Sequence, residues 1–219
     1  MNILEEIEKQ TEVSNKTEKQ QLIVNAAIKL FAEQGFSNTS TKEIAKYAGV
    51  SEGMIFKYYG KKDKLLQAII IPFISEFAPR VSKEAMEDIS RESPSSFEEF
   101  LRFFLKNRIR FLNDNKLVFR VLIKEIFYRD ELRVSLIPYF TKYVLPIFDT
   151  VINNSKEKGE LADKSTEDIM KVILTLIPSF FISRLLFLDN YEIEDHEIEV
   201  LIDFIMHGIA KREETIAWV

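Results

Sequence analysis

Two short helix-forming segments, separated by a three-residue turn, constrain this chain more than any other feature. They lie within residues 39–66, which read TSTKEIAKYAGVSEGMIFKYYGKKDKLL. Ser40 and Glu43 form the capping-box pattern that begins a helix, and Gly49 is the residue type that ends a helix in the left-handed conformation. Ser51 offers an N-cap to the second segment. Two capped helices at this spacing predict a helix-turn-helix, whose second helix enters the major groove of DNA.

The remainder of the chain also carries helical patterns. Apolar residues recur at spacings of three and four, and no segment shows the alternation that a half-buried strand requires. We expect an all-α fold of about nine helices, with an N-terminal three-helix head that contains the helix-turn-helix and a C-terminal helical bundle. The head is assigned to residues 17–64 and the bundle to residues 65–219. Residues 1–16 form an extension that is either a short amphipathic helix or disordered.

Prolines are expected to interrupt the later helices, because proline lacks a backbone donor and clashes with the preceding turn. Pro72 should kink the helix that follows the head. Residues 79–94 should form a hinge with a short or frayed helix, since their pattern is weak and charged. Helices broken at Pro138, Pro146 and Pro178 should pack imperfectly, and we therefore expect a cavity between them.

The charge distribution favours a nucleic-acid partner, although the net charge does not. The whole chain has a formal net charge of −5, whereas residues 17–64 carry eight lysines and five acidic residues, which gives +3. A basic head on an acidic body is expected of a protein that contacts phosphates with one end only.

Several other functions find no support in the sequence. The chain has no cysteine, which excludes disulfides and thiolate chemistry, and its two histidines, His196 and His207, are too far apart to share a metal ion. Nucleophile–base pairs, phosphate-binding glycine loops and HExxH patterns are missing. The longest apolar run, residues 68–74, is too short to cross a bilayer. We expect a cytoplasmic protein without catalytic activity, cofactor, metal or membrane partner.

The residues of the head resemble the tetracycline-repressor (TetR) family of bacterial transcription regulators. The similarity covers about residues 20–66. It includes Ala26-Ala27, Leu30-Phe31, Gly35-Phe36, Thr39, Ile44-Ala45, Ala48-Gly49-Val50-Ser51, Gly53, Ile55, Tyr58-Tyr59, Lys62 and Leu65-Leu66. Beyond residue 70 only the helical pattern is similar. A helical hairpin with a solvated lysine face is the simpler alternative, but it leaves the aromatic pair beside Lys57 unexplained.

The resemblance implies a double-stranded DNA operator and roles for individual residues of the head. Positions that contact backbone phosphate are occupied by Thr41, Lys42, Tyr58 and Lys62. Positions that face the bases are occupied by Glu52, Gly53, Met54 and Lys57. Phe56 belongs to the same surface, but it stands where the family usually has tyrosine, so a hydroxyl that would bond phosphate is missing. Tyr59 is assigned to the core.

The resemblance also implies an effector site in the bundle. Most phenylalanines lie beyond residue 70, and few polar residues interrupt the apolar faces. We therefore expect a hydrophobic or amphipathic effector. The candidate ligand-binding residues are Phe104, Arg108, Phe111, Phe127, Tyr139, Tyr143, Phe180 and Arg184. For each residue taken alone, ordinary core packing is the simpler interpretation.

The last two helices are apolar on more than one face, which suits a homodimer interface of the kind that the resemblance implies. The leading hypothesis is a ligand-responsive repressor that binds a palindromic operator as a dimer and is released by its effector. One alternative is a DNA-binding architectural or division-coupled factor of the same fold without effector control. Another is a helical carrier of hydrophobic ligands whose head is vestigial.

Overall fold

A computed structural model describes residues 18–185 and 193–209. The extension at residues 1–16 lies outside the described residues. The chain divides into two compact units. Unit 1 contains the described residues up to Val81 together with 111–139, and unit 2 contains 82–110 and the described residues from Phe140 onward. Unit 1 thus combines the sequence-predicted head with two further segments of the chain.

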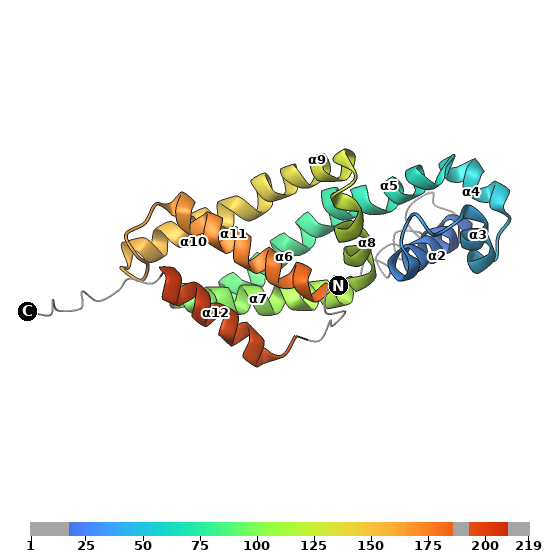
Figure 1. Ribbon diagram of the computed structural model, residues 1–219. Coiled ribbons are helices and arrows are strands. Elements are labelled where there is room, and N and C mark those ends of the chain that lie inside the picture. Colours follow the sequence, from blue (N-terminus) through green and yellow to red (C-terminus); the bar gives the residue numbers. More distant parts are fainter. Residues whose placement is uncertain (1–17, 186–192, 210–219) are drawn as a thin grey trace, which may run out of the picture. The chain divides into compact units, whose positions relative to one another are not determined.

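The described residues confirm the all-α fold. In chain order (Figure 1) the elements are α2 (Glu18–Gln34), α3 (Thr41–Ala48), α4 (Glu52–Tyr59), α5 (Lys62–Pro72), the π-helical turn η1 (Phe73–Phe77), α6 (Ala78–Glu92), α7 (Phe97–Asp114), α8 (Lys116–Ile126), α9 (Asp130–Tyr139), the π-helical turn η2 (Phe140–Val144), α10 (Leu145–Glu157), α11 (Thr166–Ser183) and α12 (Asp195–Ile209). Each π turn joins its two neighbours without a break. Over the described ranges the chain therefore forms nine continuous helices, the number expected from the sequence.

The helices do not break at Pro138, Pro146 or Pro178 as expected, whereas Pro72, where a kink is expected, lies directly before a π turn. Pro72 is the last residue of α5 and is followed directly by η1, and Pro138 lies near the end of α9, just before η2. A π turn shifts the hydrogen-bond pattern locally, so the helix continues past a residue that cannot donate. Pro178 lies inside the unbroken α11. Because these helices are continuous, the prolines no longer support the cavity that was expected between broken helices.

The predicted hinge over residues 79–94 is wrong. Residues 78–92 form α6, which continues the helix that begins at Lys62. Val81, Ala85 and Ile89 recur every four residues and are all buried. This narrow apolar stripe is enough to hold a helix against a core even though most of the segment is polar.

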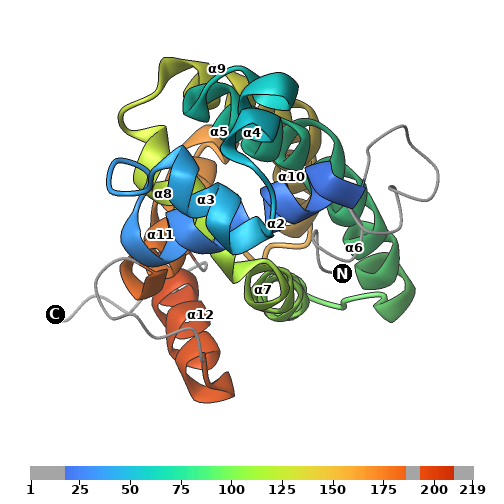
Figure 2. The same cartoon turned by 90° about the vertical axis from the view of Figure 1, so that its right-hand side faces the viewer.

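The core of unit 1 joins the head to two later helices. Ile23, Ala27 and Phe31 of α2 are fully or almost fully buried, and they belong to the same apolar cluster as Ile44 of α3 and Ile55 of α4. α2 packs on α3, α5 and α8, and α3 packs on α4. Figures 1 and 2 show the three N-terminal helices, α2, α3 and α4, lying close together. α4 therefore packs on helices whose buried residues belong to the same apolar core.

Unit 2 has a separate aromatic and aliphatic core. Phe97, Phe100 and Phe148 are buried there, and the rings of Phe100 and Phe148 meet edge to face at 5.8 Å between centroids. Ile173 of α11 and Ile202 of α12 belong to the same cluster. Edge-to-face pairs add to the stability that comes from burying the ring area itself.

The long helix from Lys62 to Glu92 is apolar and long enough to cross a membrane by length and composition alone. In the structure 61% of its most apolar window is buried inside the protein. A core helix of a water-soluble protein has the same character, because its apolar residues pack on other helices. The burial of Leu65, Ile69, Ile70 and Phe73 accounts for the composition of this helix.

Candidate nucleic-acid interface

The turn between α3 and α4 has the geometry that the sequence predicts. The Ser40 hydroxyl accepts from the Glu43 amide at 3.1 Å, and the Glu43 carboxylate accepts from the Ser40 amide at 2.8 Å, which completes the capping box. Gly49 has φ +67°. The amide of Val50 donates to the carbonyl of Ala45 at 3.0 Å. This left-handed glycine ends α3 and redirects the chain into α4 within three residues.

Small residues let α3 and α4 approach closely. Ala45 and Ala48 are buried on α3, and Ile55 is the fully buried residue of α4. The Thr41 hydroxyl also donates to the Glu52 carboxylate at 2.5 Å, which links the first turns of the two helices. The relative orientation of α3 and α4 is thus fixed by packing and by a polar link.

The surface of the two helices exposes about half of the residues predicted to contact DNA. Lys42 on α3 and Gly53, Phe56 and Lys57 on α4 are exposed. Thr41, Glu52, Met54, Tyr58 and Lys62 are partly buried. The Lys57 ammonium lies 5.9 Å from the ring centroid of Tyr58, so a basic and an aromatic side chain adjoin on α4. Cationic and apolar groups together suit a helix that meets both phosphates and base edges.

Lys62 has partners within the head. Its ammonium donates to the carbonyls of Phe36 and Thr39, each at 2.7 Å, and lies 4.2 Å from the ring centroid of Phe36. Phe36 and Thr39 belong to the loop between α2 and α3. Lys62 therefore fastens this loop to the start of α5, in addition to the phosphate contact expected from the sequence.

Tyr59 lies partly in the core, where the sequence predicts it. Its hydroxyl donates to the carbonyl of Gln20 at 3.4 Å, which connects the end of α4 to the start of α2. Burial raises the pKa of Tyr59 to about 12, and the neighbouring Tyr58 adds to the effect. Burial disfavours the charged phenolate, which is the cause of the higher pKa.

The raised pKa of Tyr59 predicts a loss of stability in alkali. In the unfolded chain the phenol loses its proton near pH 10, whereas in the folded head it keeps the proton up to about pH 12. The free energy of unfolding should therefore fall between these values, by at most about 2 kcal/mol, because solvent screens a group that is only partly buried. Urea unfolding at pH 8 to 11.5, compared between the wild type and Tyr59→Phe, measures it. An equal slope in both proteins would contradict the assignment.

Three exposed residues near the predicted surface were not identified from the sequence. Lys46 follows Lys42 by one helical turn of α3, Tyr47 is 53% exposed, and Lys61 is exposed just before α5. The Tyr47 hydroxyl also accepts from the Lys29 ammonium at 2.5 Å. The spacing of four between Lys42 and Lys46 is the signal that could have identified Lys46, because such residues share a helix face.

The predicted ligand residues are distributed over both units. Phe111, Phe127 and Tyr139 belong to unit 1, and Phe104, Arg108, Tyr143, Phe180 and Arg184 belong to unit 2. Phe111 is buried in an aromatic cluster and Phe127 is 68% exposed. In unit 2 the guanidinium of Arg184 pairs with Glu197 and lies 5.7 Å from the ring centroid of Phe180.

The guanidinium of Arg108 also has polar partners inside unit 2. It donates to the Ser82 hydroxyl at 3.0 Å and to the Asn107 side-chain oxygen at 2.5 Å. It lies 5.7 Å from the ring centroid of Phe104. Arg108 and Phe104 are therefore neighbours on α7, as their spacing of four predicts.

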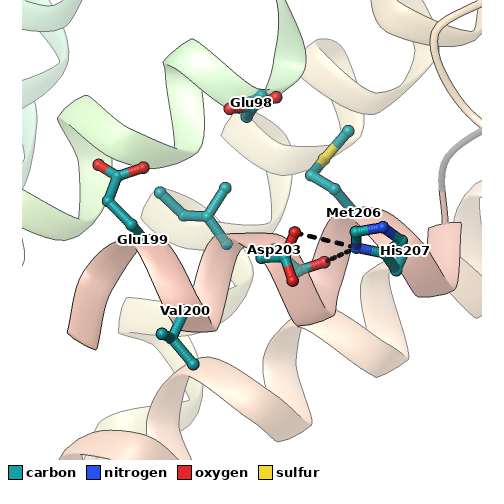
Figure 3. A pocket seen from close by; sticks show the side chains of 7 residues that line it. Glu98, Glu199, Val200, Asp203, Met206 and His207 are labelled. Carbon is teal, nitrogen blue, oxygen red and sulfur yellow. Dashed lines mark hydrogen bonds and ion pairs between the residues drawn. The ribbon is translucent and has the colours of Figure 1, made fainter. Parts of the chain in front are cut away.

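A surface pocket of about 500 Å³ lies between α7 and α12 in unit 2 (Figure 3). Its lining residues are Glu98, Glu199, Val200, Ile202, Asp203, Met206 and His207. The imidazole of His207 lies 3.0 Å from the Asp203 carboxylate, and the Arg102 guanidinium bonds both Glu98 and Glu199 at 2.8 Å. None of the predicted ligand residues lines this pocket. Within the described ranges, no group of three histidine, aspartate or glutamate side chains is arranged to hold a metal ion.

Comparison with known proteins places the similarity mainly in the head. Residues 23–69 match the family described as bacterial regulatory proteins, tetR family. The HTH-type transcriptional regulator HbdR of Aromatoleum sp. is 47% identical over 49 residues, which are 22% of this chain and 21% of that protein. The chain spans only 18% and 21% of the length of two curated relatives that match this region.

Weaker similarity extends into the bundle. The fatty acid metabolism regulator protein of Bacillus subtilis is 24% identical over 151 residues, which are 69% of this chain and 75% of that protein. The crystal structure of the transcriptional regulator FadR from Bacillus subtilis in complex with stearoyl-CoA superposes with a TM-score of 0.64 at 21% identity, covering 85% of this chain and 97% of that one. This chain and the FadR chain share a fold. Both relatives are named as regulators.

Proposed function

We propose that this chain, whose residues 23–69 match the tetR family of bacterial regulatory proteins, is a homodimeric, ligand-responsive repressor of that family that binds a palindromic operator. The observation that carries this proposal is the fixed helix-turn-helix, in which α4 is anchored by Ile55 and exposes Lys57 beside Tyr58. Such a helix is built to enter the major groove, while Lys42 at the start of α3 meets backbone phosphate.

Lys57 and Lys42 are proposed to act differently on DNA. Lys57 lies on the base-facing part of α4, and a lysine there can donate to guanine O6 or N7. Lys57→Ala should weaken binding to the preferred duplex by about 1–3 kcal/mol and relax the preference at one base position. Lys42→Ala should weaken binding to all duplexes alike, because phosphate contacts carry no sequence information. Selection from random duplexes, followed by titration of each variant, measures both effects.

The matched control for these variants is Lys116→Ala, at the exposed start of α8 in the same unit. It removes the same charge from a helix outside the proposed interface and should leave the preferred sequence unchanged. An unchanged preference in Lys57→Ala would show that Lys57 does not read bases. The same affinity in Lys42→Ala as in the wild type would remove the phosphate contact from the proposal.

The homodimer is proposed to form through the last two helices. Val172 and Leu176 of α11 are 41% and 36% exposed, and Val200 and Phe204 of α12 are 49% and 72% exposed. Large apolar side chains exposed on two successive helices suit an interface that a second copy covers. A dimer also suits a palindromic operator, because two recognition helices must lie about 34 Å apart to enter successive major grooves.

The effector is proposed to be a hydrophobic or amphipathic molecule with an acyl chain. Two observations support this class: the similarity to a protein named as a fatty acid metabolism regulator, and the many phenylalanines in unit 2, of which Phe103, Phe104 and Phe181 are only partly buried. Such an effector releases DNA only if it binds more tightly to a conformation with lower affinity for the operator.

Stearoyl-CoA is the first probe for this effector class, and free coenzyme A is its matched control without the acyl chain. Stearoyl-CoA should lower the affinity of the protein for its selected duplex by about 5–150-fold, the usual range of such coupling. Coenzyme A should not. Fluorescence anisotropy of labelled DNA measures the release. If no acyl-CoA from eight to eighteen carbons changes the affinity, an architectural DNA-binding role without effector control becomes the better proposal.

We place the protein in the cytoplasm, where its operator is.

The carrier alternative predicts ligand binding without DNA binding, and the double variant Lys57→Ala, Tyr58→Ala would then leave the function of the protein unchanged. The exposed basic and aromatic surface of α4 favours the regulator over the carrier, because a vestigial head has no need to present Lys57 and Phe56 to solvent.

A further inference from the structure

Arg129 connects the junction of α8 and α9 to the head. Its side chain is only 15% exposed. Its guanidinium bonds the Asp63 carboxylate and the Glu125 carboxylate, each at 2.9 Å, and lies 3.8 Å from the carboxylate of Glu131. Asp63 is in the first turn of α5, directly after the helix-turn-helix. Arg129 is 66 residues from Asp63 in the sequence, so this ion pair joins distant segments of the chain.

The same guanidinium lies 4.3 Å from the ring centroid of Phe36. Phe36 is 8% exposed and occupies the loop between α2 and α3, where its ring also lies 5.2 Å from that of Phe31. The Lys62 ammonium is 4.2 Å from the centroid of the same ring and bonds the backbone of the loop. One aromatic side chain is thus held by two cations, which come from α5 and from the α8–α9 junction.

These contacts define a cluster of Phe36, Lys62, Asp63, Glu125 and Arg129, here called the Arg129 cluster. It joins three elements of unit 1: the loop that leads into α3, the start of α5 and the end of α8. The hydrogen bond from Arg129 holds the pKa of Asp63 below its ordinary value. Arginine suits this position because its planar group stacks on a ring and bonds carboxylates at the same time.

We infer that Arg129 is a positioning residue for DNA binding, which holds the loop before α3 and the start of α5 so that α4 keeps its orientation toward the operator. This inference rests on the proposed function. It adds a residue outside the helix-turn-helix to those that determine affinity. The loop and α5 lie at the two ends of the α3–α4 pair, and Arg129 reaches both. The other links described between this pair and the rest of unit 1 are apolar packing, the Lys62 bonds to the loop and the Tyr59 bond to Gln20.

The test compares Arg129→Lys with Arg133→Lys in the full chain, using the duplex that the wild type selects. Arg129→Lys keeps the charge but loses the planar stacking and the paired hydrogen bonds, and should weaken binding about tenfold. Arg133 lies one turn along α9, is 61% exposed and pairs only with Asp130 among the ion pairs resolved at this junction. Its lysine variant should bind as the wild type does.

Two further readouts separate positioning from a direct contact and from support of the fold. A lost phosphate contact lowers the salt dependence of binding by about one ion, whereas the charge-removing variant Arg129→Gln should weaken binding but keep the wild-type salt slope. Binding is measured at 10 °C, with circular dichroism showing that each variant is folded. If the tenfold loss of DNA affinity disappears after correction for the folded fraction of each variant, the inference is overturned. A reduced salt slope would overturn it as well.

A double-mutant cycle with Phe36→Leu tests whether Arg129 acts through its contact with the Phe36 ring. Phe36→Leu keeps an apolar side chain but removes the ring, so Arg129→Lys should cost much less DNA affinity in that background than in the wild type. Equal costs in both backgrounds would overturn the inference. Failure of the wild-type chain to bind any duplex would overturn the proposed function as well, whereas unaltered binding by Arg129→Lys would overturn this inference alone.

Discussion

Replacing Phe204 with glutamate is expected to split the dimer and to lower operator affinity by about two to four orders of magnitude, the usual gain from joining two binding modules. Phe204 is 72% exposed on α12 and has the largest exposed apolar side chain of the proposed interface. A carboxylate buried against a second copy without a partner is strongly unfavourable. Analytical ultracentrifugation and DNA titration measure the two effects on the same samples.

The matched control is Phe204→Leu, which keeps an apolar side chain at this position and should stay dimeric with operator affinity close to that of the wild type. Circular dichroism should show the same helix content for both variants, because Phe204 projects away from the core of unit 2 and its loss leaves no cavity. A monomeric glutamate variant that still binds the full operator with wild-type affinity would contradict the proposed dimer.

Replacing Phe73 with alanine is expected to have the largest effect on stability, a loss of about 3–5 kcal/mol of unfolding free energy. Phe73 is 1% exposed in η1. Its ring lies 5.2 Å from that of Phe119, 5.7 Å from that of Phe77 and 6.1 Å from that of Phe111. The loss combines the area buried by the ring, the cavity left behind and three ring contacts.

A loss of this size is a large share of the 5–15 kcal/mol that holds a typical domain, so Phe73→Ala should also lower the fraction of protein that binds DNA. Tyr128→Ala is the control in the same unit, since Tyr128 is 87% exposed and its truncation should cost less than about 0.5 kcal/mol. Urea denaturation of both variants measures the difference. Similar midpoints for the two would show that the aromatic cluster of unit 1 does not support the fold.

The sequence predicted the head better than the body, for a physical reason. Helix caps and glycines act locally, so Ser40, Glu43 and Gly49 determine their own geometry and could be interpreted without knowledge of the rest of the fold. The same holds for Ser165, whose hydroxyl accepts from the Asp168 amide at the start of α11. Helix number and most helix boundaries followed from such signals.

Contacts between distant segments could not be predicted in this way. The family resemblance assigned Lys62 to phosphate, and no local pattern indicates that its ammonium bonds the carbonyls of Phe36 and Thr39. The role of Arg129 could not be predicted from the sequence, because its partner Asp63 is 66 residues away. The hinge at residues 79–94 was predicted because a stripe of Val81, Ala85 and Ile89 is too narrow to stand out among charged neighbours.

The central claim is that α3 and α4 bind DNA, and the most direct measurement is the affinity of the wild-type chain for duplexes that it selects from a random library, titrated at several salt concentrations. We predict saturable binding to a palindromic sequence, with the logarithm of affinity falling linearly as the logarithm of salt concentration rises. Absence of saturable binding to any selected duplex, or affinity that does not change with salt, would contradict the claim.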